Sequence, residues 1–147
     1  MDAPDKQLKG GCLCGAVEYS VPDAFEYARF CHCSECRRFS GSAFSAFGGL
    51  PKASFKVTKG ADSIKHYAKS EQSVLGFCEH CGSSLYADKP LRGMLHLRLG
   101  TLRDAPSLKP RSHVFVGSKA PWFDIKDGLA QYEGSSTGPC LIEETQA

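Results

Sequence analysis

Seven of the eight cysteines in this chain lie in three short clusters, and that spacing limits what the chain can fold into. The clusters are GGCLCG at residues 10–15, CHCSEC at residues 31–36 and CEHCG at residues 78–82. Cysteines bunched two or three residues apart are typical of metal sites, whereas disulfide frameworks usually spread their cysteines along the chain. We therefore expect the clusters to bind metal.

A disulfide framework is the alternative, because eight is an even number. Three observations weigh against it. A chain of 147 residues can bury a core without covalent help. The polar N-terminus has no apolar segment that could serve as a secretory signal, so we expect a cytoplasmic protein with reduced thiols. Cys12 and Cys14 are also too close in sequence to pair with each other without strain.

Composition narrows the classes of partner. The net charge is only +2, and basic and acidic residues are mixed along the chain without a basic stripe, so we expect no nucleic-acid partner. No apolar stretch approaches the roughly 20 residues of a membrane span, so we expect no membrane partner either. The oligomeric state cannot be predicted from these features.

Short apolar runs separated by glycine and proline predict a mostly β domain. A single helical turn is expected at residues 34–39, ended by Ser40-Gly41. Gly48, Gly49 and Pro51 are expected to form a turn. The expected strands are residues 16–21, 25–30, 43–47, 54–57, 63–67, 74–77, 94–99 and 112–116. The expected organisation is a flexible lead-in at 1–9, one zinc-binding domain at 10–133 and a tail at 134–147.

The seven clustered thiols divide economically into four and three. One closed site would use Cys12, Cys14, Cys78 and Cys81. Two thiolates on one tetrahedral zinc lie about 3.8 Å apart when Zn–S is near 2.3 Å. Residues i and i+2 of an extended strand are about 6.6 Å apart, so Cys12 and Cys14 must lie where the backbone bends. Gly82 permits a positive φ after the last cysteine, which lets backbone N–H groups turn toward the sulfurs.

The other site would use Cys31, Cys33 and Cys36, with no fourth ligand adjacent in sequence. Zinc on three thiolates carries a formal charge of about −1, so it is a weak Lewis acid that can still hold an incoming thiol as its thiolate. This favours sulfur chemistry on a small carbonyl. The alternatives are an empty site or one closed by a further ligand; the candidates are a water, a substrate thiolate, His32, Glu35, His80 and Cys140.

Three stretches, GGCLCGAVEY, CHCSECRR and FCEHCGSSL, are similar to the glutathione-dependent formaldehyde-activating (Gfa-like) family, also called the centromere-protein-V (CENP-V/GFA) domain family. The later segments HVFVGSKAPWFDI (residues 113–125) and DGLAQYE (residues 127–133) resemble its closing part. The resemblance implies an Mss4-like fold of antiparallel sheets pinned by zinc. It also implies the same division into a structural zinc site of four cysteines and a catalytic zinc site of three.

The activity implied by the resemblance is that of a carbon–sulfur lyase acting on a glutathione adduct of a small aldehyde, such as S-hydroxymethylglutathione. The alternative is a non-enzymatic, zinc-binding, Mss4-like module that binds a protein or another partner. Arg37 or Arg38 would hold a substrate carboxylate or offset the charge of the second zinc, unless they are solvated surface charges. Trp122 would line the substrate pocket, or else pack structurally. His113 is expected to be structural rather than catalytic.

Overall fold

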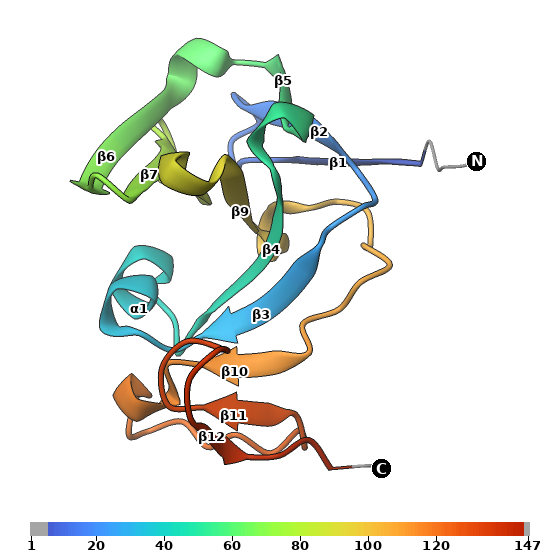
Figure 1. Ribbon diagram of the computed structural model, residues 1–147. Helices are drawn as coiled ribbons and strands as arrows, with labels where there is room; N and C mark the ends of the chain where they lie inside the picture. Colours follow the sequence, from blue (N-terminus) through green and yellow to red (C-terminus); the bar gives the residue numbers. More distant parts are fainter. Residues whose placement is uncertain (1–5, 146–147) are drawn as a thin grey trace. The chain divides into compact units, whose positions relative to one another are not determined.

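The computed structural model describes residues 6–145 of the chain and is mostly β, as predicted. Most strands are short, and they are bounded by turns (Figure 1). The strands are β1 (Gln7–Gly11), β2 (Glu18–Pro22), β3 (Tyr27–Cys31), β4 (Ser45–Pro51), β5 (Lys56–Lys59), β6 (Ile64–Ser70), β7 (Ser73–Cys78), β8 (Ser84–Lys89), β9 (Met94–Arg98), β10 (Ser112–Val114), β11 (Ala130–Tyr132) and β12 (Cys140–Ile142).

The α-helix α1 (Ser34–Ser40) is the predicted helical turn. It begins after Cys33, whose side chain caps the helix, and ends at Gly41, whose φ of 65° supplies the left-handed residue that terminates it. Short 3₁₀ helices connect several strands: η1 (Lys52–Ser54), η2 (Ala61–Ser63), η3 (Pro90–Arg92), η4 (Leu99–Thr101) and η5 (Val116–Ser118). Within residues 6–145, no helix is long and apolar enough to cross a membrane.

The chain divides into two compact units, and the single domain expected over residues 10–133 stays a prediction. Among the described residues, unit 1 contains 6–27 together with Gly48–Leu108, and unit 2 contains Ala28–Phe47 together with 109–145. Of the expected lead-in, residues 1–5 lie outside the described part, but Gln7 to Lys9 belong to β1. The expected tail also contains a strand, β12.

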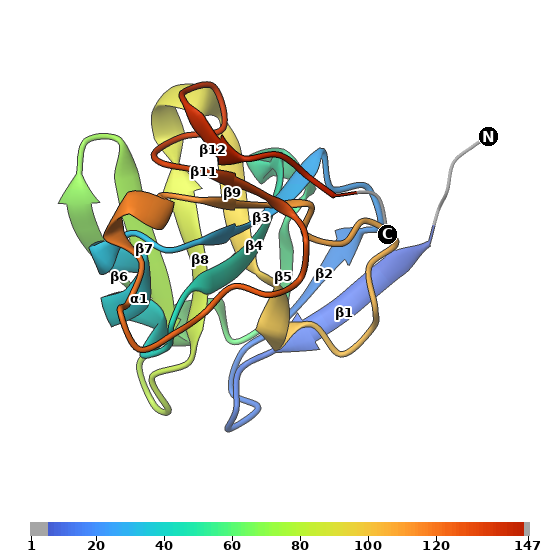
Figure 2. The same ribbon diagram turned by 90° about the horizontal axis from the view of Figure 1, so that it is seen from below.

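Unit 1 contains two antiparallel arrangements. Strands β1, β2 and β5 form one sheet, in which Gly10 pairs with Tyr19. Strands β6, β7, β8 and β9 follow one another as antiparallel neighbours (Figure 2). The core of this unit gathers apolar side chains from both sets, from β4 and from the loops beside β2: Leu8, Val17, Tyr19, Val21, Phe25, Leu50, Leu85, Tyr86, Leu95 and Leu97.

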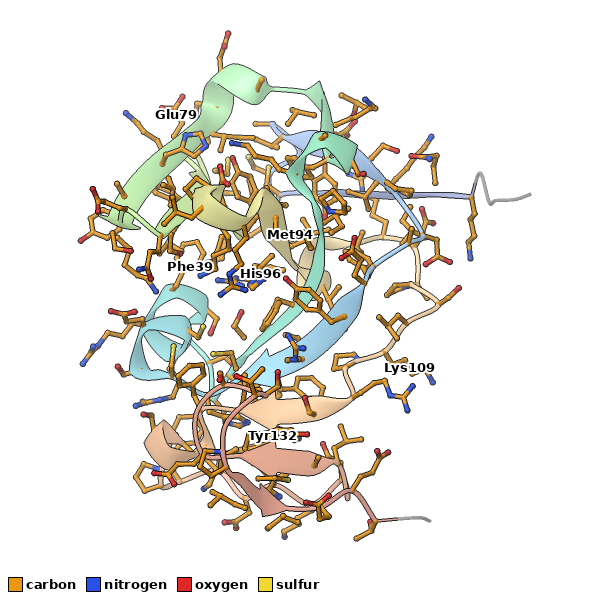
Figure 3. The ribbon with its side chains drawn as sticks, viewed as in Figure 1. Phe39, Glu79, Met94, His96, Lys109 and Tyr132 are labelled. Atoms are coloured by element: carbon orange, nitrogen blue, oxygen red, sulfur yellow. The ribbon has the colours of Figure 1, made fainter. Side chains whose placement is uncertain are left out.

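Strand β9 is buried on both faces, although its sequence alternates between apolar and polar residues. Leu95 and Leu97 lie on one face as predicted, and both are almost fully buried. His96 and Arg98 on the other face are also buried, and His96 Nε2 is 2.8 Å from the hydroxyl of Tyr27 (Figure 3). The polar face of this strand is therefore part of the interior.

Unit 2 departs from purely antiparallel pairing. Strand β10 runs parallel to β3 on one side and to β11 on the other, and β11 pairs antiparallel with β12. The rings of Phe30, Phe44 and Phe123 pack around two buried histidines in this unit. The parallel strand pairs were not predicted, because short strands of one sequence type do not reveal their direction.

The turn expected at Gly48, Gly49 and Pro51 is wrong, because all three residues belong to β4. The two glycines instead leave room for aromatic rings. A Cβ on Gly48 would lie 2.6 Å from a ring carbon of Phe25, and a Cβ on Gly49 would lie 2.3 Å from the ring of Tyr27. Glycine in this strand therefore marks a close approach of side chain to backbone.

Candidate metal sites

Unit 1 brings together four thiols from two turns that are distant in sequence. The four-thiol cluster consists of Cys12, Cys14, Cys78 and Cys81, and its Sγ atoms all lie within 4.8 Å of one another. The first two residues lie between β1 and β2, and the last two lie at the end of β7 and in the following turn. The cluster therefore joins both antiparallel arrangements of unit 1.

The sulfur spacing of the four-thiol cluster fits a tetrahedral metal ion. The Sγ atoms of Cys12 and Cys14 are 3.7 Å apart, and those of Cys14 and Cys78 are 3.8 Å apart. Four sulfurs at about 2.3 Å from one ion would be separated by about 3.8 Å. All eight cysteines of the chain are free thiols, so no disulfide competes for these sulfurs.

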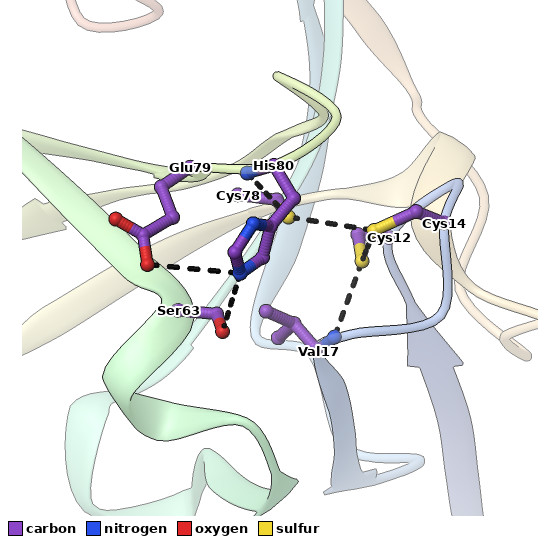
Figure 4. Close-up of polar contacts among 7 residues, drawn as sticks. All are labelled: Cys12, Cys14, Val17, Ser63, Cys78, Glu79 and His80. Atoms are coloured by element: carbon purple, nitrogen blue, oxygen red, sulfur yellow. Dashed lines mark hydrogen bonds and ion pairs between the residues drawn. The ribbon is translucent and has the colours of Figure 1, made fainter.

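Backbone N–H groups turn toward the sulfurs of the cluster (Figure 4). Val17 N–H donates to Cys12 Sγ at 3.2 Å, and His80 N–H donates to Cys78 Sγ at 3.4 Å. Gly15 and Gly82, which follow the second cysteine of each pair, have φ values of 83° and 78°. The positive φ expected at Gly82 is present, and such N–H···S bonds stabilise thiolates that bind a cation.

Local hydrogen bonds also favour a thiolate at Cys81. Its Sγ lies 3.2 Å from the Ser83 hydroxyl. The hydroxyl and then the backbone N–H of Ser83 are the main reasons that the pKa of the Cys81 thiol is lowered to about 5. A thiolate present at neutral pH is ready to bind a metal ion without first losing a proton.

Unit 2 holds a second group, the three-thiol cluster of Cys31, Cys33 and Cys36, whose Sγ atoms also lie within 4.8 Å of one another. Cys31 ends β3 and is buried, whereas the other two are half-buried. Cys33 caps α1, and its Sγ accepts a hydrogen bond from Cys36 N–H at 3.2 Å. The short helix therefore fixes how these two thiols face each other.

The three-thiol cluster shares its protons unevenly. Thiol donors at Cys31 and then Cys36 lower the pKa of the Cys33 thiol to about 2. The same contacts with Cys33 and Cys36, together with burial, raise the pKa of Cys31. One thiolate held by two thiols is a strongly cation-attracting arrangement, and a bound cation would displace the remaining protons.

Among the described residues, no fourth ligand joins the three-thiol cluster. The group whose ligand atoms all lie within 4.8 Å of one another contains no further His, Cys, Asp or Glu atom, so a fourth ligand from His32, Glu35 or Cys140 stays a prediction. Cys140 Sγ instead lies 3.2 Å from the carbonyl of Ile142. His80 Nε2 lies 3.2 Å from the Ser63 hydroxyl and 3.7 Å from Glu79 Oε2 (Figure 4).

The candidate substrate contacts lie in different surroundings. Arg37 is half-buried on α1, and its Nε is buried without a hydrogen-bond partner among the described residues. Arg38, the next residue of α1, is exposed. Trp122 is 71% exposed, so it does not pack structurally as the alternative required. The role of all three residues in binding substrate stays a prediction.

The contact between His32 and His113, beside the three-thiol cluster, could not be predicted from the sequence. His32, which lies between two of the cysteines, is fully buried, and its Nε2 is 2.8 Å from Nδ1 of His113. The two residues are 81 positions apart. The alternation of residues around His113 predicts a strand, but it does not show which other strand lies beside it.

Fold and site together define a mostly β protein with two clusters of cysteines that could each hold a metal ion. Residues 7–118 match the model of the family described as glutathione-dependent formaldehyde-activating enzyme. The chain belongs to this family. The match begins with β1 and continues through all seven clustered cysteines as far as η5.

Three relatives illustrate the distance within the family. A Halomonas elongata protein provisionally named as a glutathione-dependent formaldehyde-activating enzyme is 28% identical over 81% of both chains. An uncharacterized lyase of Schizosaccharomyces pombe is 31% identical, over 54% of this chain and 56% of its own length. A crystal structure of a Rhodobacter sphaeroides protein is 25% identical with a TM-score of 0.56, covering 67% of this chain and 91% of that one. The chain therefore spans only about half the length of the Schizosaccharomyces pombe protein.

Proposed function

We propose that this protein is a zinc-dependent carbon–sulfur lyase acting on the glutathione adduct of a small aldehyde, with S-hydroxymethylglutathione as the model substrate. The four-thiol cluster would hold a structural zinc, and the three-thiol cluster would hold a catalytic and more labile one. Family membership and the names of the relatives support glutathione-linked formaldehyde activation or lyase-type chemistry. Free thiols throughout the chain support a reducing compartment such as the cytoplasm.

The observation that carries this proposal is the difference between the two clusters. One has four sulfurs, which would complete a tetrahedron around an ion, whereas the other has three, which would leave one position of a bound ion open. A closed site serves stability, and an open site can accept a ligand from solution. When bound, zinc on three thiolates would hold an incoming thiol as its thiolate at neutral pH.

The reaction requires the protein to bind glutathione, to help remove the thiol proton and to help protonate the carbonyl oxygen. In the synthetic direction the thiol of glutathione loses its proton, its sulfur forms a bond to the carbonyl carbon, and the carbonyl oxygen gains a proton. Cleavage reverses each of these changes. Arg37, partly buried on α1 directly after Cys36, would bind a carboxylate of glutathione through its guanidinium.

The experiment measures metal content, glutathione binding and the exchange rate between formaldehyde and its glutathione adduct. Protein purified without chelator is expected to hold two zinc ions and to accelerate exchange above the uncatalysed rate. Cys33→Ser is expected to hold one zinc and to lose the acceleration. Cys140→Ser removes a cysteine outside both clusters, so it is the matched control and is expected to behave as the parent protein does.

The opposite result is equally clear. A protein that holds two zinc ions but neither binds glutathione nor accelerates exchange would disprove the lyase. That outcome would favour the non-enzymatic alternative, a zinc-binding module that recognises a protein or another partner.

A further inference from the structure

Two buried histidines and one carboxylate of unit 2 form a hydrogen-bonded row next to the three-thiol cluster. His32 Nε2 lies 2.8 Å from His113 Nδ1, and His113 Nε2 lies 2.8 Å from Asp127 Oδ2. His32 is 0% exposed and His113 is 1% exposed, whereas the Asp127 side chain is 43% exposed. The row therefore runs from a solvated carboxylate to a fully buried ring between two thiols.

The carboxylate sets the order of the protons along the row. Partial burial alone would raise the pKa of Asp127, but the hydrogen bonds from His113 and from the Leu129 N–H outweigh this effect, so the pKa is lowered overall. The carboxylate is therefore ionised and only accepts hydrogen bonds. His113 therefore donates through Nε2–H. In the neutral His113 ring, Nδ1 carries the lone pair that accepts the Nε2–H of His32.

This order leaves Nδ1 of His32 without a proton. This nitrogen is buried and has no hydrogen-bond partner within residues 6–145. Reversing the proton order would place two lone pairs against each other at one contact, and an unpaired buried polar group costs about 1–3 kcal/mol. A single proton order is therefore favoured.

Aromatic packing restricts the rotation of both imidazole rings. Phe30 stacks on His113 with ring centroids 4.9 Å apart, and Phe44 lies 5.2 Å from His32. Phe123 lies 5.6 Å from Phe44 and closes the group. Rings packed in this way keep one orientation, so each ring nitrogen keeps the same hydrogen-bond partner.

The main chain attaches the same segment to β10. His113 pairs with Phe30 and Val114 pairs with Cys31 in the parallel ladder of β10 and β3. His32 N–H continues this pairing, because it donates to the Val114 carbonyl at 3.0 Å. The segment from Cys31 to Cys33 is therefore held to β10 through both its backbone and the His32 ring.

We propose that Asp127, His113 and His32 are positioning residues, which fix the proton of His32 on Nε2 and so hold the thiols of Cys31 and Cys33 in the geometry that binds metal. This inference rests on the metal-binding part of the proposed function, but not on the identity of the substrate. None of the three residues needs to bind the metal. Residues that orient ligands typically change metal affinity by about 10- to 100-fold when they are lost.

The test uses the full-length, zinc-loaded protein and the variant Asp127→Asn. An asparagine can either accept from His113 Nε2 or donate to it, so the proton order is no longer enforced. The matched control is Asp124→Asn, which removes an exposed carboxylate from the same segment. Nitrogen-15 NMR of the imidazoles is expected to show only the Nε2–H tautomer at His32 and His113 in the parent and the control. A second tautomer is expected in Asp127→Asn.

Metal affinity is the second measurement. Competition with a chromogenic chelator is expected to show that Asp127→Asn weakens the three-thiol cluster by about 10- to 100-fold. The four-thiol cluster lies in the other unit and serves as an internal reference, whose affinity is expected to stay within about twofold of the parent. Asp124→Asn should leave both affinities unchanged.

Two variants at His113 separate hydrogen bonding from packing. His113→Asn keeps an acceptor for His32 Nε2–H but loses the link to Asp127, whereas His113→Leu removes both. Affinity of the three-thiol cluster is expected to fall in the order parent, His113→Asn, His113→Leu. Equal losses in the two variants would reduce the role of His113 to filling space and would overturn the proposal.

Further outcomes would contradict the positioning role or separate it from the proposed lyase activity. A His32 ring with its proton on Nδ1 in the parent would contradict the proton order, as would an Asp127→Asn protein whose affinities match those of Asp124→Asn. A parent protein with the expected tautomers and two metal sites, but without lyase activity, would remove the proposed substrate and leave the positioning row intact. A three-thiol cluster that binds no metal in the parent would overturn the positioning role together with the proposed catalytic site.

Discussion

The Sγ atoms of Cys14 and Cys78 lie 3.8 Å apart, although 64 residues separate them in the chain. The two sulfurs belong to different turns of unit 1, and each turn supplies a second thiol to the same cluster. A metal ion at this point would therefore tie together the two antiparallel arrangements of the unit.

Cys78→Ser is expected to lose the structural metal ion and much of the stability of unit 1. Binding of zinc at structural sites contributes apparent free energies of about 10–16 kcal/mol in small domains, so the loss should be large. Thermal unfolding with and without excess zinc, together with metal analysis, checks this. Cys140→Ser is the control. An unchanged melting temperature in Cys78→Ser would show that the cluster is not a stabilising metal site.

A chelator is expected to remove metal from the protein in two steps. The three-thiol cluster offers one sulfur fewer than the four-thiol cluster, so it should release its ion first and the four-thiol cluster should release its ion later. Metal release followed against time, with circular dichroism recorded at each step, distinguishes them. We expect the β signal to persist after the first ion and to fall with the second. Simultaneous release would argue against two independent sites.

Gly60→Ala is expected to destabilise the protein more than Gly93→Ala. Both glycines have positive φ values, 76° and 65°, so both substitutions bring backbone strain of about 1 kcal/mol. A Cβ on Gly60 would also lie 1.8 Å from the carbonyl oxygen of Ala16, whereas nothing lies within 4 Å of a Cβ on Gly93. Urea unfolding should show an additional loss of about 1–3 kcal/mol at Gly60. Equal losses would mean that the backbone yields at no cost.

Asp23 is expected to make stability depend on pH in acid. Its carboxylate accepts from the Ser107 N–H at 2.9 Å and from the Ser107 hydroxyl, and these bonds hold its pKa below the ordinary 3.8. The unfolded chain then binds the proton more readily, so the contribution is complete well above pH 4 and is lost as the pH falls through the folded pKa.

Asp23→Asn should therefore lower the free energy of unfolding by about 1–2 kcal/mol at pH 7. Its difference from the parent should shrink as the pH falls below 4. Asp62→Asn, at an exposed position of the same unit, should show no such trend. A deficit in Asp23→Asn that stays constant down to the lowest pH would refute the assignment.

Arg37→Ala is expected to weaken glutathione binding more than Arg38→Ala. Arg37 is partly enclosed, so its charge is less screened, and it follows the three-thiol cluster directly in α1. A loss of about tenfold in affinity at Arg37 would correspond to one charge-assisted hydrogen bond. Calorimetric titration with glutathione measures both variants, and equal effects would remove Arg37 from the proposed site.

Local pattern predicted several parts of this structure. The division of the thiols into four and three follows from tetrahedral geometry and the spacing of the cysteines, and the structure brings together the same two groups. The short helix was predicted because a capping side chain and Ser40-Gly41 bracket it, and Gly82 has the positive φ that its turn requires. Each of these features depends on neighbours within a few residues.

Features that depend on distant residues were missed. Gly48 and Gly49 were assigned to a turn, since nothing in the sequence shows that the rings of Phe25 and Tyr27 lie against them. Strands β1, β8, β11 and β12 were not predicted either, because their sequences have weak alternation. The contact between His32 and His113 needs the parallel pairing of β3 with β10, which no local pattern encodes.

The two clusters differ in when their sulfurs become available during synthesis. Cys31, Cys33 and Cys36 leave the ribosome together, so the second site has all its protein ligands almost at once. Cys14 must precede Cys78 by 64 residues, which at about 5–20 residues per second is roughly 3–13 s. The four-thiol cluster is thus the later of the two to have all its ligands. Until Cys78 and Cys81 have been synthesised, the thiols of Cys12 and Cys14 can react with oxidants or bind other metal ions.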